Sequence, residues 1–383
     1  MWIVSQKEST YGTAVAPGAG VGIVKHTLPP GTQPILRTKN VLSNKDYASG
    51  NRHETNRIFL EQMYDGPLSL WLSPESFGQF FGYALGKDTK SPIGTGGVEH
   101  LLVPETDAND ASIPSFTLYE YLPEINSGTD SVWTLSGMMV EEVTLRVTPQ
   151  TGIMTIQATL RGSGEDNADA NLSSYDSDTN DGPIYLFTAG KVDVFINEVI
   201  AEGGDVWEEG TFTDPTTAGY PGGVDDLEDA KSIGKHLVEV TVTYRNTFDN
   251  GHGPGSGQTG SGRARRRSIR QDYEVVGTIT HRVDSTHSWI RDRFEELQSG
   301  EQEFAMQISG VGDEFIDTGE TTYCGWSLIV PLARFDQEGQ GRSDSTREPL
   351  SRTMPFTAQK QANHELIEAA VWDKIDENYG NAG

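Results

Sequence analysis

Cysteine is nearly absent from the sequence. The single cysteine, Cys324, excludes a disulfide within the chain and a metal site built from several cysteines. It lies in the apolar stretch TTYCGWSLIVPLARF, which is typical of a β-strand. We therefore expect a buried and unreactive thiol at this position.

Long apolar runs and catalytic motifs are missing as well. No stretch approaches the run of about 18 apolar residues that a membrane helix needs. The N-terminal residues lack a basic region followed by an apolar one, so we expect no signal peptide. The sequence contains no HExxH, GxxxxGK[ST] or GxSxG pattern. We expect a protein that is not an enzyme, binds no cofactor and does not enter a membrane.

Basic residues are scarce relative to acidic ones. The 383 residues include 56 Asp and Glu but only 29 Lys and Arg, which gives a net charge of −27. The acidic residues are spread along the chain, and the resulting repulsion is tolerable where salt screens it within ~3 Å, as at 1 M. This pattern favours a halophilic host, although an ordinary acidic protein remains the alternative. A field of this sign opposes tight binding of nucleic acid.

The pattern of apolar residues predicts a mainly β fold with short helices. Residues 140–147, 236–246 and 273–283 alternate between apolar and polar side chains, as half-buried strands do. Helices are expected at 74–86 and 286–299, where apolar residues recur at helical spacing. Ser73 suits the N-cap of the first helix, and Gly86 suits its end.

The order of these elements divides the chain into five segments. The expected segments are an N-terminal arm (1–33), a first β domain (34–162) with a stacking loop (35–62), an acidic loop (163–183), a second β domain or second half (184–350) with insertions at 202–234 and 249–270, and a C-terminal segment (351–383). In the C-terminal segment, residues 362–379 fit both a helix and a strand, and we favour a helix. A strand is also expected at 184–190.

The two halves show an internal echo. Gly66 precedes an expected strand and Gly277 lies inside one, and in both halves an expected helix and a further strand follow. Residues 140–152 also resemble residues 237–251. The echo indicates a tandem duplication, and chance similarity among amphipathic strands is the competing explanation.

Only a few residues stand out as candidate contact or metal sites. Arginines cluster in two segments and are candidates for contact with an acidic face of a neighbouring subunit; DNA contact or a solvated loop are the alternatives. These arginines are Arg52, Arg57, Arg263, Arg265, Arg266, Arg267 and Arg270. Asp176, Asp178 and Asn180 have the spacing of the first calcium-loop ligands, but the glycine comes one place late and Phe187 stands where the loop needs Glu. We therefore favour a solvated acidic loop and expect no metal.

Taken in order, these segments resemble the tail tube (major tail) proteins of long-tailed viruses. The resemblance is carried by KESTYGTAVAP, RHETNR (52–57), GPLSLWLSPESFGQFFGYALGK, SFTLYEYL, VEEVTLRVTPQTGIMTIQATLRG, VVGTITHRVDS and LIVPLARF. It implies tail-tube β-sandwich or barrel domains whose strands join those of neighbouring copies around a lumen. In this family each ring has six domains, so a chain with two domains implies three copies per ring and a chain with one implies six.

The resemblance also implies partners and a location. The protein would assemble with itself into stacked rings, meet other tail proteins at the tube ends and let viral DNA pass without specific contacts. It would be made in the host cytoplasm and reside in the tail of the virion. Two alternatives stay open: another virion structural protein, such as a capsid decoration or baseplate component, and a secreted halophilic β-sandwich that binds a ligand or acts as an enzyme.

Overall fold

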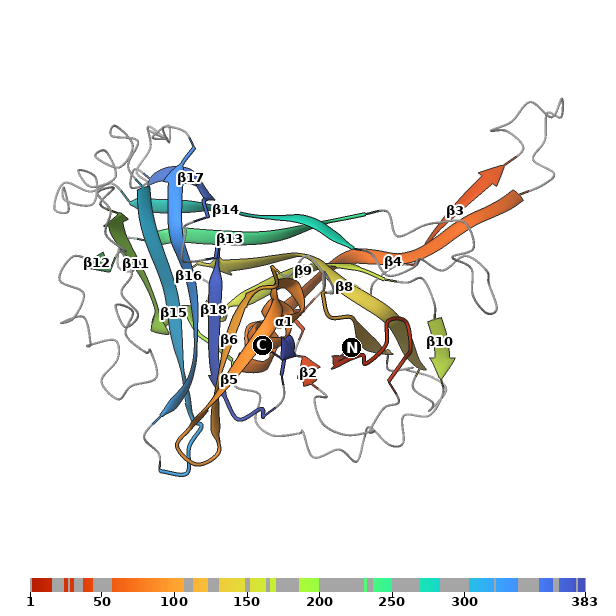
Figure 1. Cartoon of the computed structure of the whole chain (residues 1–383), viewed down its shortest axis with the longest axis horizontal. Helices are drawn as coiled ribbons and strands as arrows, with labels where there is room; N and C mark the ends of the chain where they lie inside the picture. Colours follow the sequence, from red (N-terminus) through yellow and green to blue (C-terminus); the bar gives the residue numbers. More distant parts are fainter. Residues whose placement is uncertain are drawn as a thin grey trace.

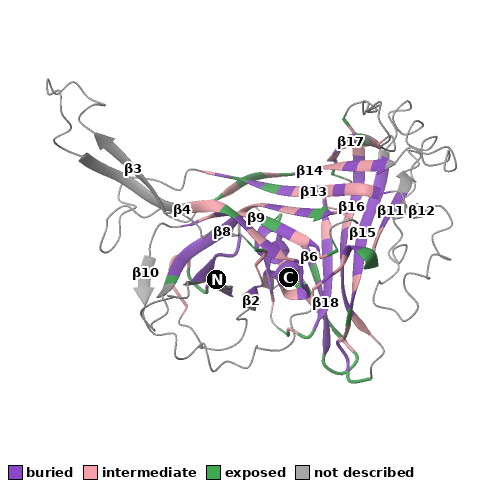
Figure 2. Cartoon of the chain, turned by 180° about the vertical axis from the view of Figure 1, so that it is seen from behind, coloured by how far each residue is buried: buried purple, intermediate pink, exposed green. Residues whose placement is uncertain are grey.

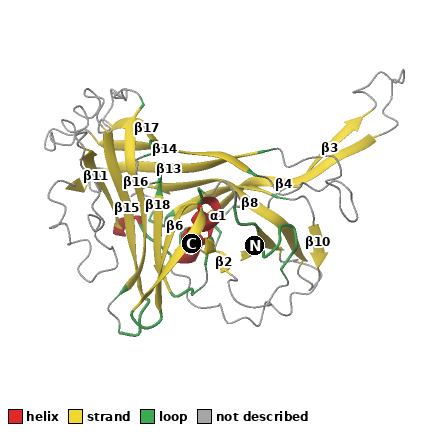
Figure 3. Ribbon diagram, in the orientation of Figure 1, coloured by secondary structure: helices red, strands yellow, loops and turns green. Residues whose placement is uncertain are grey.

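The computed structural model of the chain is mainly β, with one large and almost wholly antiparallel sheet and, among the residues that it describes, one short α-helix (Figure 3). The described residues are 2–15, 24–26, 28–30, 37–43, 57–106, 113–122, 131–148, 152–162, 166–169, 186–199, 231–232, 237–249, 269–282, 303–319, 322–336, 351–360, 365–376 and 378–382.

The N-terminal half contributes seven strands that pair in the order β2-β1-β7-β8-β9-β4-β3. Every pairing in this series is antiparallel. The strands are β1 (Trp2–Lys7), β2 (Val24–His26), β3 (Arg37–Ser43), β4 (Arg57–Trp71), β7 (Phe116–Leu122), β8 (Ser131–Val147) and β9 (Thr155–Arg161).

The C-terminal half repeats this arrangement with seven other strands. They pair, again antiparallel, in the order β12-β11-β15-β16-β17-β14-β13. The strands are β11 (Val192–Val199), β12 (Lys231–Ser232), β13 (Leu237–Phe248), β14 (Arg270–Arg282), β15 (Glu303–Phe315), β16 (Tyr323–Phe335) and β17 (Ser351–Ala358). Each strand has the same place along the chain and the same neighbours as its counterpart. The two series meet where β13 pairs with β8.

A few elements fall outside the repeated series. They are β5 (Gly86–Ile93), β6 (Gly97–Pro104), β10 (Asp166–Asp169), η1 (Ala189–Lys191), β18 (Glu368–Asp373) and β19 (Asn381–Ala382). β18 lies between β16 and β6, so the C-terminal segment joins strands of both halves. β19 runs parallel to β5.

The strands form two layers that cross at a steep angle, with the helix between them. In Figure 1, β4, β9, β8, β13 and β14 run across the molecule, whereas β15, β16, β18 and β6 run down it. Helix α1 (Pro74–Leu85) packs against strands of both layers, chiefly β8, β6 and β18. The described strands of one chain do not close into a barrel. β3 and the first part of β4 extend as a hairpin away from the body (Figure 1).

The helix expected at 74–86 is confirmed, with the expected caps. The Ser73 side chain accepts a hydrogen bond from the Ser76 backbone N–H (3.1 Å), and the Ser76 side chain accepts one from the Ser73 N–H (2.8 Å). Pro74 occupies the first turn, where a missing N–H costs nothing. Gly86 ends the helix with a φ of 104°, a conformation that disfavours residues with a Cβ.

Several sequence expectations differ from the structure. The helix favoured within 362–379 is wrong, because β18 occupies 368–373 and is held by strand partners on both edges. The strand expected at 184–190 is also wrong over its described part, where Ala189 begins the short 3-10 helix η1. The helix expected at 286–299 lies outside the described residues.

The N-terminal segment and β8 depart from expectation in a different way. Residues 1–33 were expected to form an arm, yet β1 lies within the sheet beside β7. The strand expected at 140–147 is longer in the structure, where it is the second part of β8, which begins at Ser131. Gly137, with a φ of 65°, lies at the change from one set of partners to the other.

The core lies between the two layers and around the helix (Figure 2). Along β13, Val240, Val242 and Tyr244 are buried, while the residues between them are exposed or half-exposed. Phe77 of α1 lies against Trp326 of β16, with ring centroids 5.2 Å apart. One core therefore serves both halves of the chain.

Close packing at the helix generates a stability prediction. A Cβ added at Gly78 would lie 2.3 Å from Cε2 of the buried Tyr379 ring. Alanine gains up to ~1 kcal/mol of helix propensity, but overpacking a rigid core costs about 1–3 kcal/mol. We expect Gly78→Ala to lower the free energy of unfolding by about 1–2 kcal/mol in a denaturant titration. Gly190→Ala is the control, because a Cβ there meets no atom within 4 Å, and equal stability of the two variants would contradict the prediction.

Candidate functional site

One face of the crossing layer is polar and accessible. Along β4, β9, β8, β13, β14 and β17, every second residue points to this face and none of these residues is buried. We call it the polar sheet face; its residues are Ser69, Trp71, Thr155, Gln157, Thr159, Glu142, Thr144, Arg146, Glu239, Thr241, Thr243, Arg245, Glu274, Val276, Thr278, Thr280, Thr353, Pro355 and Thr357. Threonine is the commonest of them, as suits strands that expose one side.

Hydroxyl pairs and ion pairs cross this face from strand to strand. The hydroxyl oxygens of Thr144 and Thr243 lie 3.0 Å apart. Arg245 binds two carboxylates from the neighbouring strands, Glu142 and Glu274, each at 2.8 Å. The remaining charged residues of the face also pair, with Arg146 Nη2 2.8 Å from Glu239 Oε2.

These contacts neutralise the charge of the polar sheet face locally. Exposed ion pairs of this kind contribute only ~0–1 kcal/mol each to stability. Their larger effect is electrostatic, because both arginines already bind carboxylates and present no isolated positive charge. The face is therefore rich in hydroxyl groups and close to neutral, because its three glutamates surround two arginines, on a chain whose net charge is −27.

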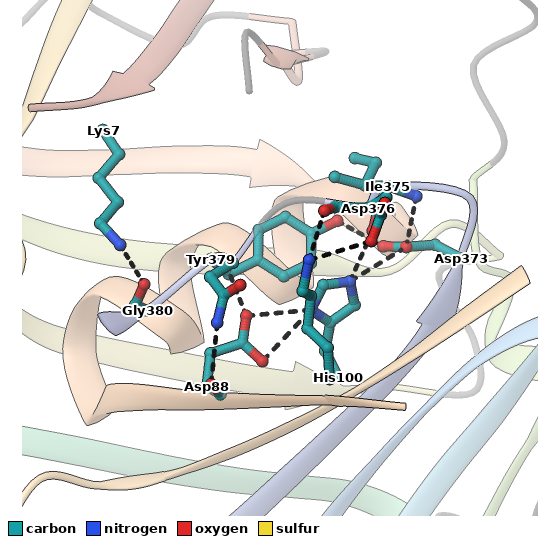
Figure 4. A network of polar contacts seen from close by, with 10 residues as sticks. Lys7, Asp88, His100, Asp373, Ile375, Asp376, Tyr379 and Gly380 are labelled. Carbon is teal, nitrogen blue, oxygen red and sulfur yellow. Dashed lines mark hydrogen bonds and ion pairs between the residues drawn. The ribbon is translucent and has the colours of Figure 1, made fainter. Parts of the chain in front are cut away.

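A second polar cluster is buried beneath the helix, where β5, β6 and the C-terminal segment meet (Figure 4). Nδ1 of His100 lies 3.0 Å from Asp88 Oδ2, and its Nε2 lies 2.8 Å from the backbone oxygen of Ile375. A carbonyl oxygen and an ionised carboxylate both accept hydrogen bonds, so these contacts favour donation by both ring nitrogens, as in an imidazolium. The Asp373 carboxylate lies 3.6 Å from Nε2 and also accepts a hydrogen bond from the Tyr379 hydroxyl.

Burial and charge shift the pKa values in this cluster. Burial alone would lower the pKa of His100, but the hydrogen bond to Asp88 and the charges of Asp373 and Asp88 outweigh it, and the pKa is raised. Burial raises the pKa of Asp373 from its usual 3.8 to about 6, in spite of the nearby imidazolium. The charges of His100 and its carboxylates hold one another inside the core.

The buried cluster fastens the two ends of the chain rather than forming an active site. The side chains of His100 and Asp88 have no exposed surface, so no substrate reaches them. The backbone N–H of Tyr379 donates to Asp88 at 2.6 Å, and Lys7 of β1 donates to the backbone oxygen of Gly380. The sequence offered no signal for this cluster, because its members are far apart along the chain.

Glu8 anchors the N-terminal segment in a similar way. Its buried carboxylate accepts hydrogen bonds from Ser115 Oγ (2.8 Å), Thr117 Oγ1 (2.9 Å) and the backbone N–H groups of Gly12 (2.9 Å) and Gly137 (2.8 Å). Burial raises the pKa of Glu8 although these donors favour the charged form. The carboxylate thus ties β1 to β7 and to the bend of β8.

Of the candidate site residues, the structure describes the side chain of Arg270 alone. Its guanidinium lies 4.9 Å from the centre of the Tyr273 ring, and its Nη1 donates to the Tyr244 hydroxyl at 3.1 Å. These contacts join β14 to Tyr244 of the neighbouring strand β13. Arg57 belongs to β4, but its side chain lies outside the description, as do Arg52, Arg263, Arg265, Arg266, Arg267, Asp176, Asp178 and Asn180. Their roles stay predictions.

The thiol of Cys324 is buried, as expected, and burial raises its pKa to about 11. Within the described ranges, no group of three or more His, Cys, Asp or Glu side chains is suited to a metal ion. None of the helices in the described part of the chain has the length and apolar character that crossing a bilayer requires.

The sequence matches no protein-family model and no curated protein. The resemblance to tail tube proteins therefore stays a prediction.

The raised pKa values predict how stability depends on pH. A group whose pKa is higher in the folded state contributes stability at low pH and loses it as pH rises. The stability that Asp373 contributes is lost as pH rises from about 4 to 6. The stability that His100 contributes is lost at pH values above 6.5. We expect Asp373→Asn to remove the first part, so that between pH 4 and 7 the variant gains up to about 3 kcal/mol relative to the parent.

The measurement is the free energy of unfolding by denaturant titration across this pH range, at constant high salt. Asp376→Asn is the matched control, because its side chain is 87% exposed and only three positions away. A pH dependence that Asp373→Asn and Asp376→Asn share would show that the buried carboxylate is not its source.

Proposed function

We propose that this protein is a structural subunit of a viral tail tube, which assembles into stacked rings around a conduit for DNA. The observation that carries the proposal is a broad, open β-sheet with the polar sheet face on one side and the core on the other. Such a sheet supplies the wall of a tube if copies join edge to edge. The sequence resemblance to tail tube proteins points the same way.

The strand order leaves the sheet two lateral ends. Eight strands follow one another in the order β3-β4-β9-β8-β13-β14-β17-β16. β3 stands at one end of this order and the end of β16 at the other. Unpaired strand edges attract further strands, and a ring of copies provides them through rotational symmetry.

The repeated strand order supports three copies per ring over six. Each half contributes four of the eight strands, so three chains would supply six equivalent units. At ~4.8 Å between strands and ~40° of tilt, three chains close at a backbone diameter of about 50 Å, and six at about 95 Å. Adding an outer layer of sheet and helix, about 20 Å thick on each side, gives a tube about 90 Å wide for three chains.

The polar sheet face suits the wall of a DNA conduit. Free Lys and Arg side chains bind phosphates and would slow the passage of DNA. On this face Arg146 and Arg245 are engaged by carboxylates, and hydroxyl groups cover much of the remainder. The wall would therefore repel DNA only weakly and hold it only weakly.

The first test is negative-stain electron microscopy of the purified protein in high salt, followed by dilution into low salt. We expect stacked rings or hollow tubes about 80–100 Å wide, as the sheet geometry requires, and threefold averages with a sixfold-like outline. Dilution into low salt should disassemble them, because the acidic copies then repel one another. A monomer at every salt concentration would contradict the proposal, and a fixed oligomer that never stacks would favour a capsid or baseplate component.

The balance of charge on the polar sheet face can be tested separately. Glu142→Gln with Glu274→Gln releases Arg245, so assembled tubes of this variant should retain double-stranded DNA in a sedimentation assay, with binding that falls steeply as salt rises. Asp376→Asn with Glu314→Gln removes as many carboxylates beside Lys90 and Lys374, outside the polar sheet face. Equal DNA retention by the two variants would show that this face does not line the conduit.

A further inference from the structure

The junction between the two halves provides a template for a contact between copies. β13 has a partner on each edge, β14 from its own series and β8 from the other. Its counterpart in the first series is β3, which pairs with β4. Among the described residues, β4 is the one strand that pairs with β3. In the second series β8 occupies the other edge of β13. No strand in the described part of the chain occupies the equivalent edge of β3.

The residue correspondence between the two series follows from their registers. Gly66 of β4 pairs with Leu160, which pairs with Val140 of β8. Gly277 of β14 pairs with Phe356, which pairs with Phe335 of β16. Equating the two glycines therefore equates Val140 with Phe335.

An independent pairing gives the same correspondence. β7 begins its pairing with β8 at Phe116 opposite Met138, and β15 begins its pairing with β16 at Phe304 opposite Ala333. Equating these two phenylalanines equates Met138 with Ala333. Met138 and Ala333 are separated along the chain by the same number of residues as Val140 and Phe335. Residues 138–140 of β8 therefore correspond one by one to residues 333–335 of β16.

The correspondence also locates the contact. Glu142 of β8 lies opposite Thr159, the residue before Leu160. The Asp336 N–H donates to the oxygen of Pro355, the residue before Phe356, at 3.0 Å. Between Val140 and Glu142 the register of β8 against β9 shifts by one residue, so Glu142 lies opposite Thr159 although it comes two positions after Val140. Asp336 follows Phe335 directly and bonds to Pro355, so it has the position of Glu142 in the strand pairing. The partner of Glu142 across the internal junction is Arg245. Arg245 pairs with Glu274, three positions before Gly277, and Thr38 pairs with Met63, three positions before Gly66.

We infer that β3 of one copy pairs antiparallel with the end of β16 of a second copy, in the register that places Thr38 opposite Asp336. The inference rests on the self-assembly in the proposed function and names the strands that join. The contact repeats between copies what β13 and β8 do within one copy.

Each copy carries one β3 and one β16 end, so the contact is head to tail. A head-to-tail contact forms a ring if its rotation closes and an open filament if it does not. Here the internal junction and the contact between copies follow the same pattern, so each junction turns the sheet by a similar angle. A closed ring then contains a whole number of chains, and every β3 in it pairs with the β16 end of a neighbouring copy.

Cysteine cross-linking of the assembled protein tests this register directly. Residues directly opposite in antiparallel strands lie close enough for a disulfide, and the native Cys324 is buried and does not interfere. We expect oxidised Thr38→Cys/Asp336→Cys to form covalent multimers on a denaturing gel, at least about tenfold more than either single variant. Arg245→Cys/Glu142→Cys, at the internal template, should instead form a disulfide within one chain.

The outcomes separate this inference from the proposed function. Tubes in which the template pair cross-links but Thr38→Cys/Asp336→Cys does not would overturn the β3–β16 contact and leave the tube intact. Cross-linked rings that never stack would support the contact and count against the tube.

A backbone variant gives a second and independent readout. Lys39→Pro removes an N–H and a strand conformation from β3, and we expect it to abolish rings while leaving the melting temperature of the monomer nearly unchanged. Lys39→Thr keeps the N–H and should still assemble. Rings formed equally well by both variants would overturn the inference.

Discussion

Every β-strand carries two edges of N–H and C=O groups, and each edge needs a partner or water. In this chain that requirement organises the whole molecule. Within each of two series of seven strands, neighbouring strands hydrogen-bond to one another in the same order. The pairing of β13 with β8 joins the two series into one sheet. The same requirement leaves β3 and the end of β16 as the lateral ends of an eight-strand order, which is why assembly is the natural proposal for the protein.

The two faces of that sheet carry different chemistry because they meet different surroundings. The inner face packs on α1 and on the second layer, and its side chains are apolar and close-packed around a helix with glycine at Gly78 and Gly82. The opposite face has no core to bury, and it pairs threonine with threonine and arginine with glutamate. The pairing matters on so acidic a chain, because it cancels charge where copies would face a common lumen.

The ends of the chain are held by polar groups inside the core. His100, Asp88 and Asp373 bring the C-terminal segment onto β5 and β6, and Glu8 holds β1 beside β7. A buried charge without a partner is costly, so these groups specify one arrangement of the termini. They hold the C-terminal segment against strands of the N-terminal half. β18 also holds this segment, because its backbone pairs with β16 on one edge and β6 on the other.

Local patterning in the sequence was sufficient to predict the mainly β class, the capped helix at 74–86 and most long strands, because alternation and caps act over a few residues. It also indicated the echo around Gly66 and Gly277, but loosely, since amphipathic strands resemble one another. Tertiary structure alone decided which strands pair and turned the segment around Val371 into a strand, because β16 and β6 offer hydrogen bonds on both sides. It alone assembled the polar sheet face and the His100 cluster, whose members are distant in sequence and meet only when the sheet registers are set.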